Sequence, residues 1–376
     1  MAIKHTFVSG KADSADPTVV NASNWNANHT IDNNTITYAL MQQVSADKRV
    51  LGNNSGAAGN VSELTASQIF DMVSSTNGVL LTRTAGSWAA VANVTTDSGD
   101  LVHATSTATQ PSAGSKAFAR SVGGRNMLSA YPSKGSAYDF QPLLFRRKFW
   151  SFNPNNNGTT VLDSSGIAVS GAGTITARTP ATTNMFTSAQ RVGWVSASTA
   201  NAVCGVVPAS ANMAWRGNAA GLGGFFIVCR FGISDAALVS GNMLVGLSVR
   251  SNSTTGAPSA LANVIGFGCD STDTVMQLYA SGSVAQTRTS LGANFPANTV
   301  STDWYEAILF AAPNDTQVTY QLTRLNTGDV ASGTISTAAN LPATTTWMTP
   351  VIWRNNAGVA SAVAVDIGGC YLETEV

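Results

Sequence analysis

Short apolar runs recur at nearly regular intervals through residues 221–376, and clusters of turn-forming residues separate them, as at 252–256 (NSTTG) and 313–315 (PND). Runs of this length between turn signals are typical of β-strands, because a helix usually needs about ten or more residues of helical periodicity. The pattern therefore predicts a domain built from strands. The predicted strands are 224–231, 244–250, 264–269, 274–280, 304–311, 317–325, 330–335, 348–354 and 363–372.

Two of these segments alternate between apolar and other residues with a period of two. In 317–325, Val318, Tyr320 and Leu322 share one face of a strand. In 363–372, apolar residues at 363, 365 and 367 oppose Ala364 and Asp366. Such alternation is typical of antiparallel sheets with one solvated face. With no helix between the strands, we expect a mainly β protein whose C-terminal part is an antiparallel β-sandwich of the jelly-roll type. Earlier strands are expected at 174–178 and 191–195.

Composition excludes several classes of protein. Only 11% of the 376 residues are charged, and 20 Lys and Arg balance 20 Asp and Glu. A chain without net charge has no long-range field to attract nucleic acid. No apolar run approaches the roughly 20 residues that span a bilayer, so membrane insertion is not expected. Residues 1–7 lack the apolar core of a signal peptide, which predicts synthesis in the cytoplasm.

The four cysteines are Cys204, Cys229, Cys269 and Cys370. None are spaced as a CxxC metal or redox pair. Most lie within apolar runs, where a thiol behaves as a small buried hydrophobe. This favours free cysteines in the core, with disulfides as the alternative.

The first 150 residues are more polar and divide into three parts. Residues 1–40 contain the cluster 24–31 (NWNANHTI), which is either a loop with Trp25 in a small local core or a docking segment anchored by Trp25. Residues 41–100 contain a helix of about ten residues, since Thr65 and Gln68 fit a capping box, followed by a hairpin over 78–91. Residues 101–150 form a connector, and its cations at 146–148 are read as the solvated end of a core strand rather than as a nucleic-acid site.

This N-terminal region offers little apolar surface to offset the ordering entropy, about 1–2 kcal/mol per residue for the backbone. Either it is flexible, or identical chains supply core to one another in a symmetric homo-oligomer, which we favour. The expected domain boundaries are 1–40, 41–100, 101–150 and 151–376.

Several segments together resemble the tail fibres and related appendage proteins of bacteriophages. The resemblance rests on 23–29 (SNWNANH), 51–65 (LGNNSGAAGNVSELT), 132–136 (PSKGS) with 143–145 (LLF), and in the C-terminal part on 221–226, 230–236, 291–299, 323–328 and 371–375. It implies a homotrimer in the virion. It also implies an extended N-terminal stalk that docks on a baseplate, tail, collar or capsid protein through Trp25, Asn26 and His29. The lectin-like C-terminal head would then bind a glycan or protein of the host surface.

The sequence contains no arrangement typical of an enzyme. Its three histidines are His5, His29 and His103, all outside the predicted head, and no metal-spaced cluster or phosphate-binding loop is present. We expect neither catalysis nor a cofactor or metal. A polysaccharide-degrading spike is the alternative that needs paired carboxylates. The candidates in the head are Asp235, Asp270, Asp273, Asp303, Glu306, Asp315, Asp329 and Asp366.

Receptor contacts are predicted from aromatic side chains near loops. The simpler interpretation of the head aromatics Trp304, Trp347, Trp353, Tyr279 and Tyr305 is that each lies in the core or in a trimer interface. Trp347, and Trp353 with its neighbours Arg354 and Asn355, lie nearest to turn residues and are the receptor-binding candidates. The leading hypothesis is therefore a fibre that attaches a particle to its host, and the alternative is a purely structural head or collar fibre without a receptor.

Overall fold

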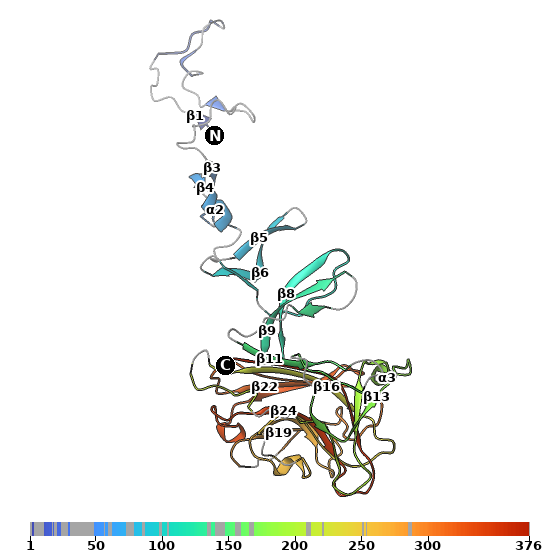
Figure 1. Cartoon of the computed structure of the whole chain (residues 1–376). Helices are drawn as coiled ribbons and strands as arrows, with labels where there is room; N and C mark the ends of the chain where they lie inside the picture. The colour runs from blue at the N-terminus through green and yellow to red at the C-terminus, as the bar shows by residue number, and fades with distance from the viewer. Residues whose placement is uncertain are drawn as a thin grey trace. The chain divides into compact units, whose positions relative to one another are not determined.

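The computed structural model describes residues 2–3, 11–16, 18, 21–23, 29–30, 49–55, 57–58, 62–72, 79–84, 87–97, 100–103, 105–133, 137–139, 147–154, 159–164, 169–207, 212–219, 222–249, 252, 254–284 and 288–375. The chain divides into two compact units, Met1–His103 and Ala104–Val376. Figure 1 labels the elements of each unit. Within the described ranges, no helix has the length and apolar character needed to cross a membrane.

The described part of the first unit contains small antiparallel sheets and a short helix after β4. Its strands are β1 (Ala2–Ile3), β2 (His29–Thr30), β3 (Arg49–Gly52), β4 (Ser62–Thr65), β5 (Val79–Thr84), β6 (Ser87–Asp97) and β7 (Asp100–His103). The expected capping box is confirmed at the start of α2 (Ala66–Asp71), where Thr65 N donates to Gln68 Oε1 at 2.8 Å and Gln68 N donates to Thr65 Oγ1 at 3.1 Å. The helix is shorter than expected, and Met72 beyond its end is exposed.

The second unit contains two large sheets whose ladders are all antiparallel. The eight-stranded sheet has the order β13-β14-β25-β16-β21-β22-β23, and β11 also pairs with β25. Its strands are β11 (Arg147–Phe152), β13 (Thr174–Ala177), β14 (Val192–Val195), β16 (Phe225–Ile233), β21 (Tyr305–Ala311), β22 (Val318–Arg324), β23 (Asp329–Ile335) and β25 (Ala364–Glu375).

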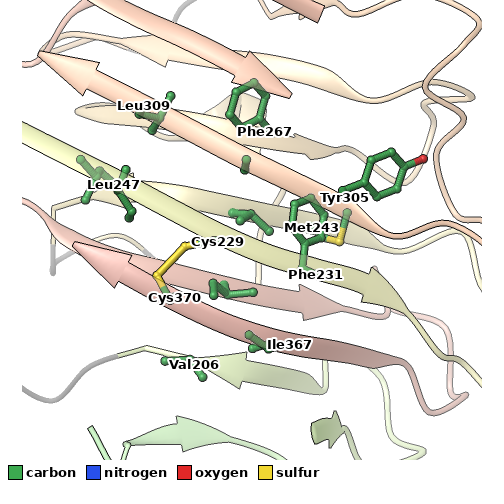
Figure 2. Close-up of a cluster of buried hydrophobic side chains, with 14 of the residues drawn as sticks. Val206, Cys229, Phe231, Met243, Leu247, Phe267, Tyr305, Leu309, Ile367 and Cys370 are labelled. Atoms are coloured by element: carbon green, nitrogen blue, oxygen red, sulfur yellow. A yellow bond between two sulfur atoms is a disulfide. The ribbon is translucent and has the colours of Figure 1, made fainter. Parts of the chain in front are cut away.

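The seven-stranded sheet has the order β12-β15-β24-β17-β18-β19-β20. Its strands are β12 (Gly171–Ala172), β15 (Val203–Val206), β17 (Asn242–Ser248), β18 (Val264–Cys269), β19 (Gln277–Ser281), β20 (Thr289–Ser290) and β24 (Thr349–Asn355). One large hydrophobic cluster draws its members from strands of both sheets, among them Phe231, Met243, Phe267 and Leu309 (Figure 2). The expected mainly β, antiparallel architecture is confirmed.

Each of the nine strands expected in residues 221–376 is present, with ends that shift by a few residues. The boundary expected at residue 150 falls inside β11, whose residues Trp150 and Phe152 belong to the core cluster. The alternation expected in β22 is confirmed, since Val318 and Leu322 are buried and their neighbours are partly exposed. The solvated face expected for β25 is wrong, because Asp366 is fully buried.

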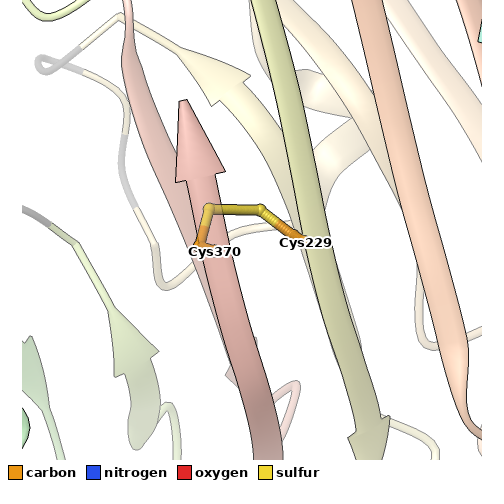
Figure 3. Close-up of a disulfide and its surroundings, with 2 residues drawn as sticks. All are labelled: Cys229 and Cys370. Atoms are coloured by element: carbon orange, nitrogen blue, oxygen red, sulfur yellow. A yellow bond between two sulfur atoms is a disulfide. The ribbon is translucent and has the colours of Figure 1, made fainter. Parts of the chain in front are cut away.

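The cysteines divide into one pair and two single thiols. Cys229 on β16 and Cys370 on β25 face each other in the ladder, with Cα atoms 4.3 Å apart, and form a disulfide (Figure 3). The prediction of free cysteines is wrong for these two, because the register that brings them together cannot be read from spacing. Cys204 and Cys269 are free and buried, as expected, and burial raises the pKa of each thiol to about 12.

A hairpin inside the expected connector was not predicted. It consists of β8 (Ser115–Val122) and β9 (Arg125–Pro132), joined by Gly123 and Gly124, and β9 also pairs with β10 (Tyr138–Asp139). Its tip packs on the eight-stranded sheet, where Met127 forms a small hydrophobic cluster with Phe226 and Ile308. This face of the sheet is therefore partly covered by the hairpin.

Candidate functional site

The predicted docking residues lie in the first unit. Trp25 and Asn26 are outside the described residues. His29 belongs to β2, where its backbone pairs with Ile3. The docking prediction for these three residues therefore stays a prediction.

Three of the four predicted receptor-binding residues are buried, which corrects the prediction for them. Trp353 is 2% exposed and packs in a cluster with Leu244 and Tyr279. Arg354 and Asn355 are both 0% exposed. The turn residues after 355 suggested a surface position, but β24 continues to Asn355 between β15 and β17.

Arg354 and Asn355 instead hold the ends of strands and loops together. Arg354 forms a two-pronged ion pair with Asp235 (Nε–Oδ1 3.2 Å, Nη2–Oδ2 2.7 Å) and donates to Val239 O at 2.6 Å. Asn355 Nδ2 donates to Thr254 O at 2.8 Å and to Gly256 O at 3.0 Å. These contacts give both side chains a structural role.

Trp347 is the remaining candidate, and the structure places a second tryptophan against it. Ala214 and Met348 form an isolated antiparallel bridge, with Ala214 N donating to Met348 O at 3.0 Å and Met348 N donating to Ala214 O at 2.7 Å. The bridge sets Trp215 opposite Trp347. Their rings stack with centroids 5.1 Å apart and an interplanar angle of 15°, and both residues are partly exposed. We call these two residues the tryptophan pair.

Arg216 anchors the loops that carry the tryptophan pair. It is 5% exposed, and its guanidinium donates to Pro342 O at 2.9 Å and to Asp315 O at 2.6 Å. Its own carbonyl accepts hydrogen bonds from Gly224 N and Asn314 N. Burial lowers the pKa of the guanidinium. The Nη1 and Nη2 contacts fix the segment on which Trp215 stands, whereas the buried Nε has no hydrogen-bond partner among the described residues.

The sequence predicted Trp347 as a receptor-binding residue but not Trp215. Trp215 lies far from Trp347 along the chain, and no local pattern joins the two residues. Only the Ala214–Met348 bridge brings them together. Two stacked indoles offer a large, rigid aromatic surface at low cost in side-chain entropy, and such a surface suits the C–H face of a pyranose ring.

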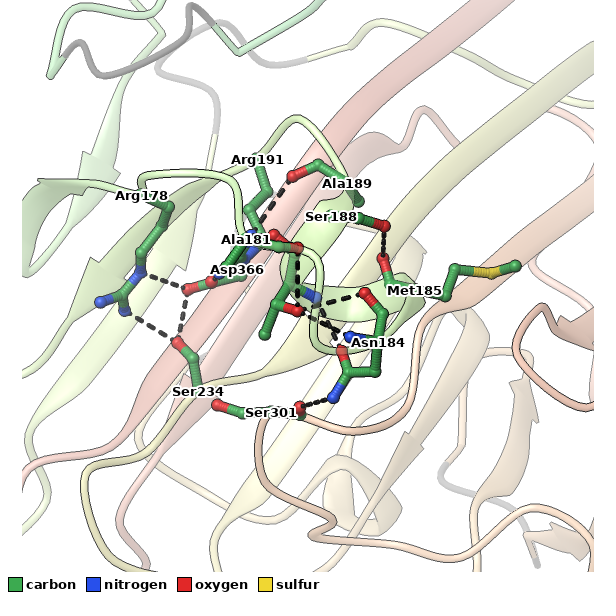
Figure 4. Close-up of polar contacts among 11 residues, drawn as sticks. Arg178, Ala181, Asn184, Met185, Ser188, Ala189, Arg191, Ser234, Ser301 and Asp366 are labelled. Carbon is green, nitrogen blue, oxygen red and sulfur yellow. Dashed lines mark hydrogen bonds and ion pairs between the residues drawn. The ribbon is translucent and has the colours of Figure 1, made fainter.

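The acidic side chains named as catalytic candidates are mostly held by arginines. Asp366 on β25 contacts Arg178 (3.0 Å), Arg191 (2.9 Å) and the Ser234 hydroxyl (Figure 4). Arg191 also donates to Thr187 O at the end of α3 (Met185–Ser188). The other candidates held by an arginine form the pairs Asp235–Arg354, Asp270–Arg288, Asp273–Arg288, Asp303–Arg324 and Glu306–Arg230.

The closely spaced pair Asp270 and Asp273 forms a turn. Asp273 N donates to Asp270 O at 2.9 Å, and Asp270 N donates to the Asp273 carboxylate at 2.8 Å. Tyr279 Oη donates to Asp270 at 3.0 Å, and burial together with these carboxylates raises the pKa of Tyr279. In the part of the chain that the structure describes, no group of three or more His, Cys, Asp or Glu side chains could hold a metal.

No protein-family model and no curated protein sequence matches the chain. Among solved structures, a protein of unknown function from Shewanella oneidensis MR-1 is 16% identical over 63% of this chain and 90% of its own, with a TM-score of 0.40. Peanut lectin is 12% identical over 61% of this chain and 97% of its own, with a TM-score of 0.40. Lectin I of Ulex europaeus is 12% identical over 61% of this chain and 98% of its own, with a TM-score of 0.38. These values are too low to assign a shared ligand.

Proposed function

We propose that the chain is a receptor-binding fibre protein of a bacteriophage particle, a homotrimer whose jelly-roll head binds a glycan on the host surface. An extended N-terminal stalk attaches it to the virion. The resemblance of residues 23–29 and 51–65 to such fibres supports the attachment. The observation that carries the binding function is the tryptophan pair, a partly exposed aromatic surface on loops fixed by Arg216.

The test is the adsorption of the purified full chain to host cells and its competition with phage adsorption. We expect Trp347→Ala and Trp215→Ala to weaken cell binding by about tenfold or more, since each removes half of the aromatic surface. Leu238→Ala is the matched control, because Leu238 is a large hydrophobic residue that is 66% exposed outside the pair. A folded chain that neither binds cells nor competes with phage contradicts the adhesive function.

The same preparation tests the other parts of the proposal. Light scattering is expected to give three times the chain mass of 38.7 kDa. A monomer mass contradicts the trimer. A trimer that forms fibres on the virion but does not adsorb to cells identifies a purely structural fibre. A loss of viscosity in host polysaccharide identifies a degrading spike.

A further inference from the structure

The second unit has a polar cleft where the two sheets reach their last strands. β23 is an edge strand of the eight-stranded sheet, and β20 is an edge strand of the seven-stranded sheet. Between β23 and the loop after β20 lies a cleft of about 520 Å³, within the range of roughly 300–1,000 Å³ typical of small-molecule sites. We call it the edge cleft. Its lining residues are Ser290, Leu291, Gly292, Ala293, Asn294, Phe295, Tyr320, Val330, Ala331 and Ser332.

Tyr320 reaches the edge cleft because its neighbour on β23 is a glycine. Tyr320 on β22 pairs with Gly333, and a Cβ on Gly333 would lie 2.7 Å from the Tyr320 hydroxyl oxygen. The absence of a side chain at 333 therefore leaves room for the phenol ring to lie across the last strand. The ring packs edge-on against Phe267, with centroids 6.1 Å apart. Among the described residues, its hydroxyl has no hydrogen-bond partner.

The opposite wall of the edge cleft is a fixed loop. Leu291 N donates to Met276 O at 3.0 Å, and Phe295 N donates to Gly292 O at 3.1 Å. Gly292 has a φ of +90°, a conformation that favours glycine. Asn294 is held from two sides, since its Nδ2 donates to Asp329 at 3.2 Å and its carbonyl accepts from Arg324 at 3.1 Å. The cleft is thus preformed, which lowers the cost of ordering on binding.

The chemistry of the lining selects the ligand class. It provides the hydroxyls of Ser290, Ser332 and Tyr320, the amide of Asn294 and one aromatic ring, and none of its ten residues carries a charged side chain. Hydroxyls and amides both donate and accept hydrogen bonds, as the hydroxyls of a sugar do. A charged ligand would find no ion partner among the lining residues.

We propose that the edge cleft is a second saccharide subsite, separate from the tryptophan pair, and that it takes an uncharged hexose unit of the host glycan. This inference rests on the proposed glycan-binding function. Tyr320 contributes its ring face and its free hydroxyl, and Ser290, Asn294 and Ser332 contribute the remaining polar contacts. Two subsites on one head raise the avidity for a repeating polysaccharide without any new contact.

The first test measures binding of the full chain to an array of uncharged hexose oligosaccharides and of sialylated ones. We expect the uncharged set to bind and Ser332→Trp, which fills the edge cleft from an exposed position, to lose at least about tenfold in affinity. Ser336→Trp is the matched control, since Ser336 is also exposed and does not line the cleft. Tyr320→Phe keeps the ring and is expected to lose about three- to tenfold.

The second test observes the cleft directly. The chain has seven tyrosines, so fluorotyrosine labelling gives few ¹⁹F resonances, and Tyr320→Phe identifies that of Tyr320. Titration with an uncharged disaccharide is expected to shift this resonance saturably in the wild type and in Trp347→Ala. The proposed subsite is wrong if the Tyr320 resonance does not shift on titration. It is also wrong if Ser332→Trp binds the uncharged oligosaccharides of the array as well as the wild type does. Loss of cell binding in Trp347→Ala alone then still supports the proposed function.

Discussion

At the scale of single residues, arginine–carboxylate pairs account for most of the buried charge in the described part of the head. The Asp235 carboxylate illustrates the arrangement, because it binds Arg354 and also accepts Ala364 N at 2.6 Å. A buried ion pair is tolerated only when the remaining donors and acceptors are also satisfied. Such pairs join distant segments of the head, as Asp235 after β16 is joined to Arg354 on β24.

The Arg125–Glu373 pair joins the hairpin to β25 and is expected to be among the costliest to break. Arg125 is 7% exposed and Glu373 is 0% exposed, and the guanidinium lies 4.9 Å from the Phe226 ring centre. Arg125→Ala leaves a buried carboxylate unpaired, so we expect the free energy of unfolding to fall by about 3–5 kcal/mol. Denaturant unfolding measures this loss.

The control for that experiment is Arg230→Ala, which removes the exposed partner of Glu306 on the same sheet. The Arg230 side chain is 56% exposed, and exposed pairs contribute about 0–1 kcal/mol. Equal losses in the two variants would show that burial of the Arg125–Glu373 pair has no energetic effect.

The two free thiols predict a loss of stability in alkali. Burial raises the pKa of Cys204 and Cys269 in the folded state to about 12, whereas a thiol in the unfolded chain ionises near pH 9. Below about pH 9 the thiols are neutral in both states and cost no stability. As the pH rises from about 9 toward 12, only the unfolded chain ionises, so the free energy of unfolding falls. At pH 10 the expected loss is about 1.4 kcal/mol per thiol. Unfolding at pH 8 and pH 10 should differ less in Cys269→Ala than in the wild type.

At the scale of secondary-structure elements, the tip of the β8–β9 hairpin is a tightly constrained turn. Gly123 and Gly124 have φ of +57° and +87°, the two-glycine turn favoured in tight hairpins. Thr319 Oγ1 donates to Gly123 O at 2.6 Å, and the Gly123 N–H donates to Gln321 at 3.3 Å. The turn is therefore bound to β22 and not only to its own strands.

Gly124→Ala tests this contact, because a Cβ at 124 would lie 2.1 Å from Thr319 Oγ1. We expect the left-handed backbone to cost about 1–2 kcal/mol and the clash about 1–3 kcal/mol more. Gly114→Ala is the control, since Gly114 has φ of +73° with nothing within 4 Å of the added Cβ. Melting temperatures that drop equally in both variants would show that the turn yields without strain.

Most strands of the head could be predicted because they carry a local signal, whereas the short strands β12, β15 and β20 were not predicted. Residues 264–269 are apolar and bounded by turns, and β18 has these limits in the structure. The β8–β9 hairpin was missed although Gly123 and Gly124 mark its turn. Strand residues such as Ser115, Ala117 and Ser121 are small and exposed and give little apolar signal, and Met127 is buried only because Phe226 and Ile308 of the sheet lie against it. The sheet residues that cover the hairpin are distant in the sequence, so a local pattern could not predict this packing.

The candidate sites depend on contacts between distant segments, so little of them could be predicted. Trp353 and Trp347 look alike in sequence, each beside polar turn residues, yet one is buried between β15 and β17 and the other stacks on Trp215. The Cys229–Cys370 pairing likewise follows from the register of β16 and β25. The edge cleft depends on Gly333 lying opposite Tyr320, and the register of the β22–β23 ladder sets this pairing.

At the scale of the whole molecule, the Cys229–Cys370 disulfide closes a loop of 141 residues. A bridge over so long a loop restricts the unfolded chain strongly, and its removal typically costs about 2–5 kcal/mol. The double variant Cys229→Ala/Cys370→Ala is expected to show this loss, while Cys204→Ala/Cys269→Ala retains the bridge. Alkylation in denaturant without reductant should modify two thiols, and reduction should make it four. Four reactive thiols before reduction would contradict the bridge.

β25 is an inner strand of the eight-stranded sheet, with β16 on one side and β14 and β11 on the other. It is also the last of these strands to leave the ribosome, and Glu373 meets Arg125 across 248 residues of chain. Until it emerges, its three neighbours have unpaired edges, which are prone to aggregation. The eight-stranded sheet is therefore incomplete until β25 has emerged. We therefore expect a chain that stops before residue 364 to leave the edges of β11, β14 and β16 exposed and not to fold into a binding head.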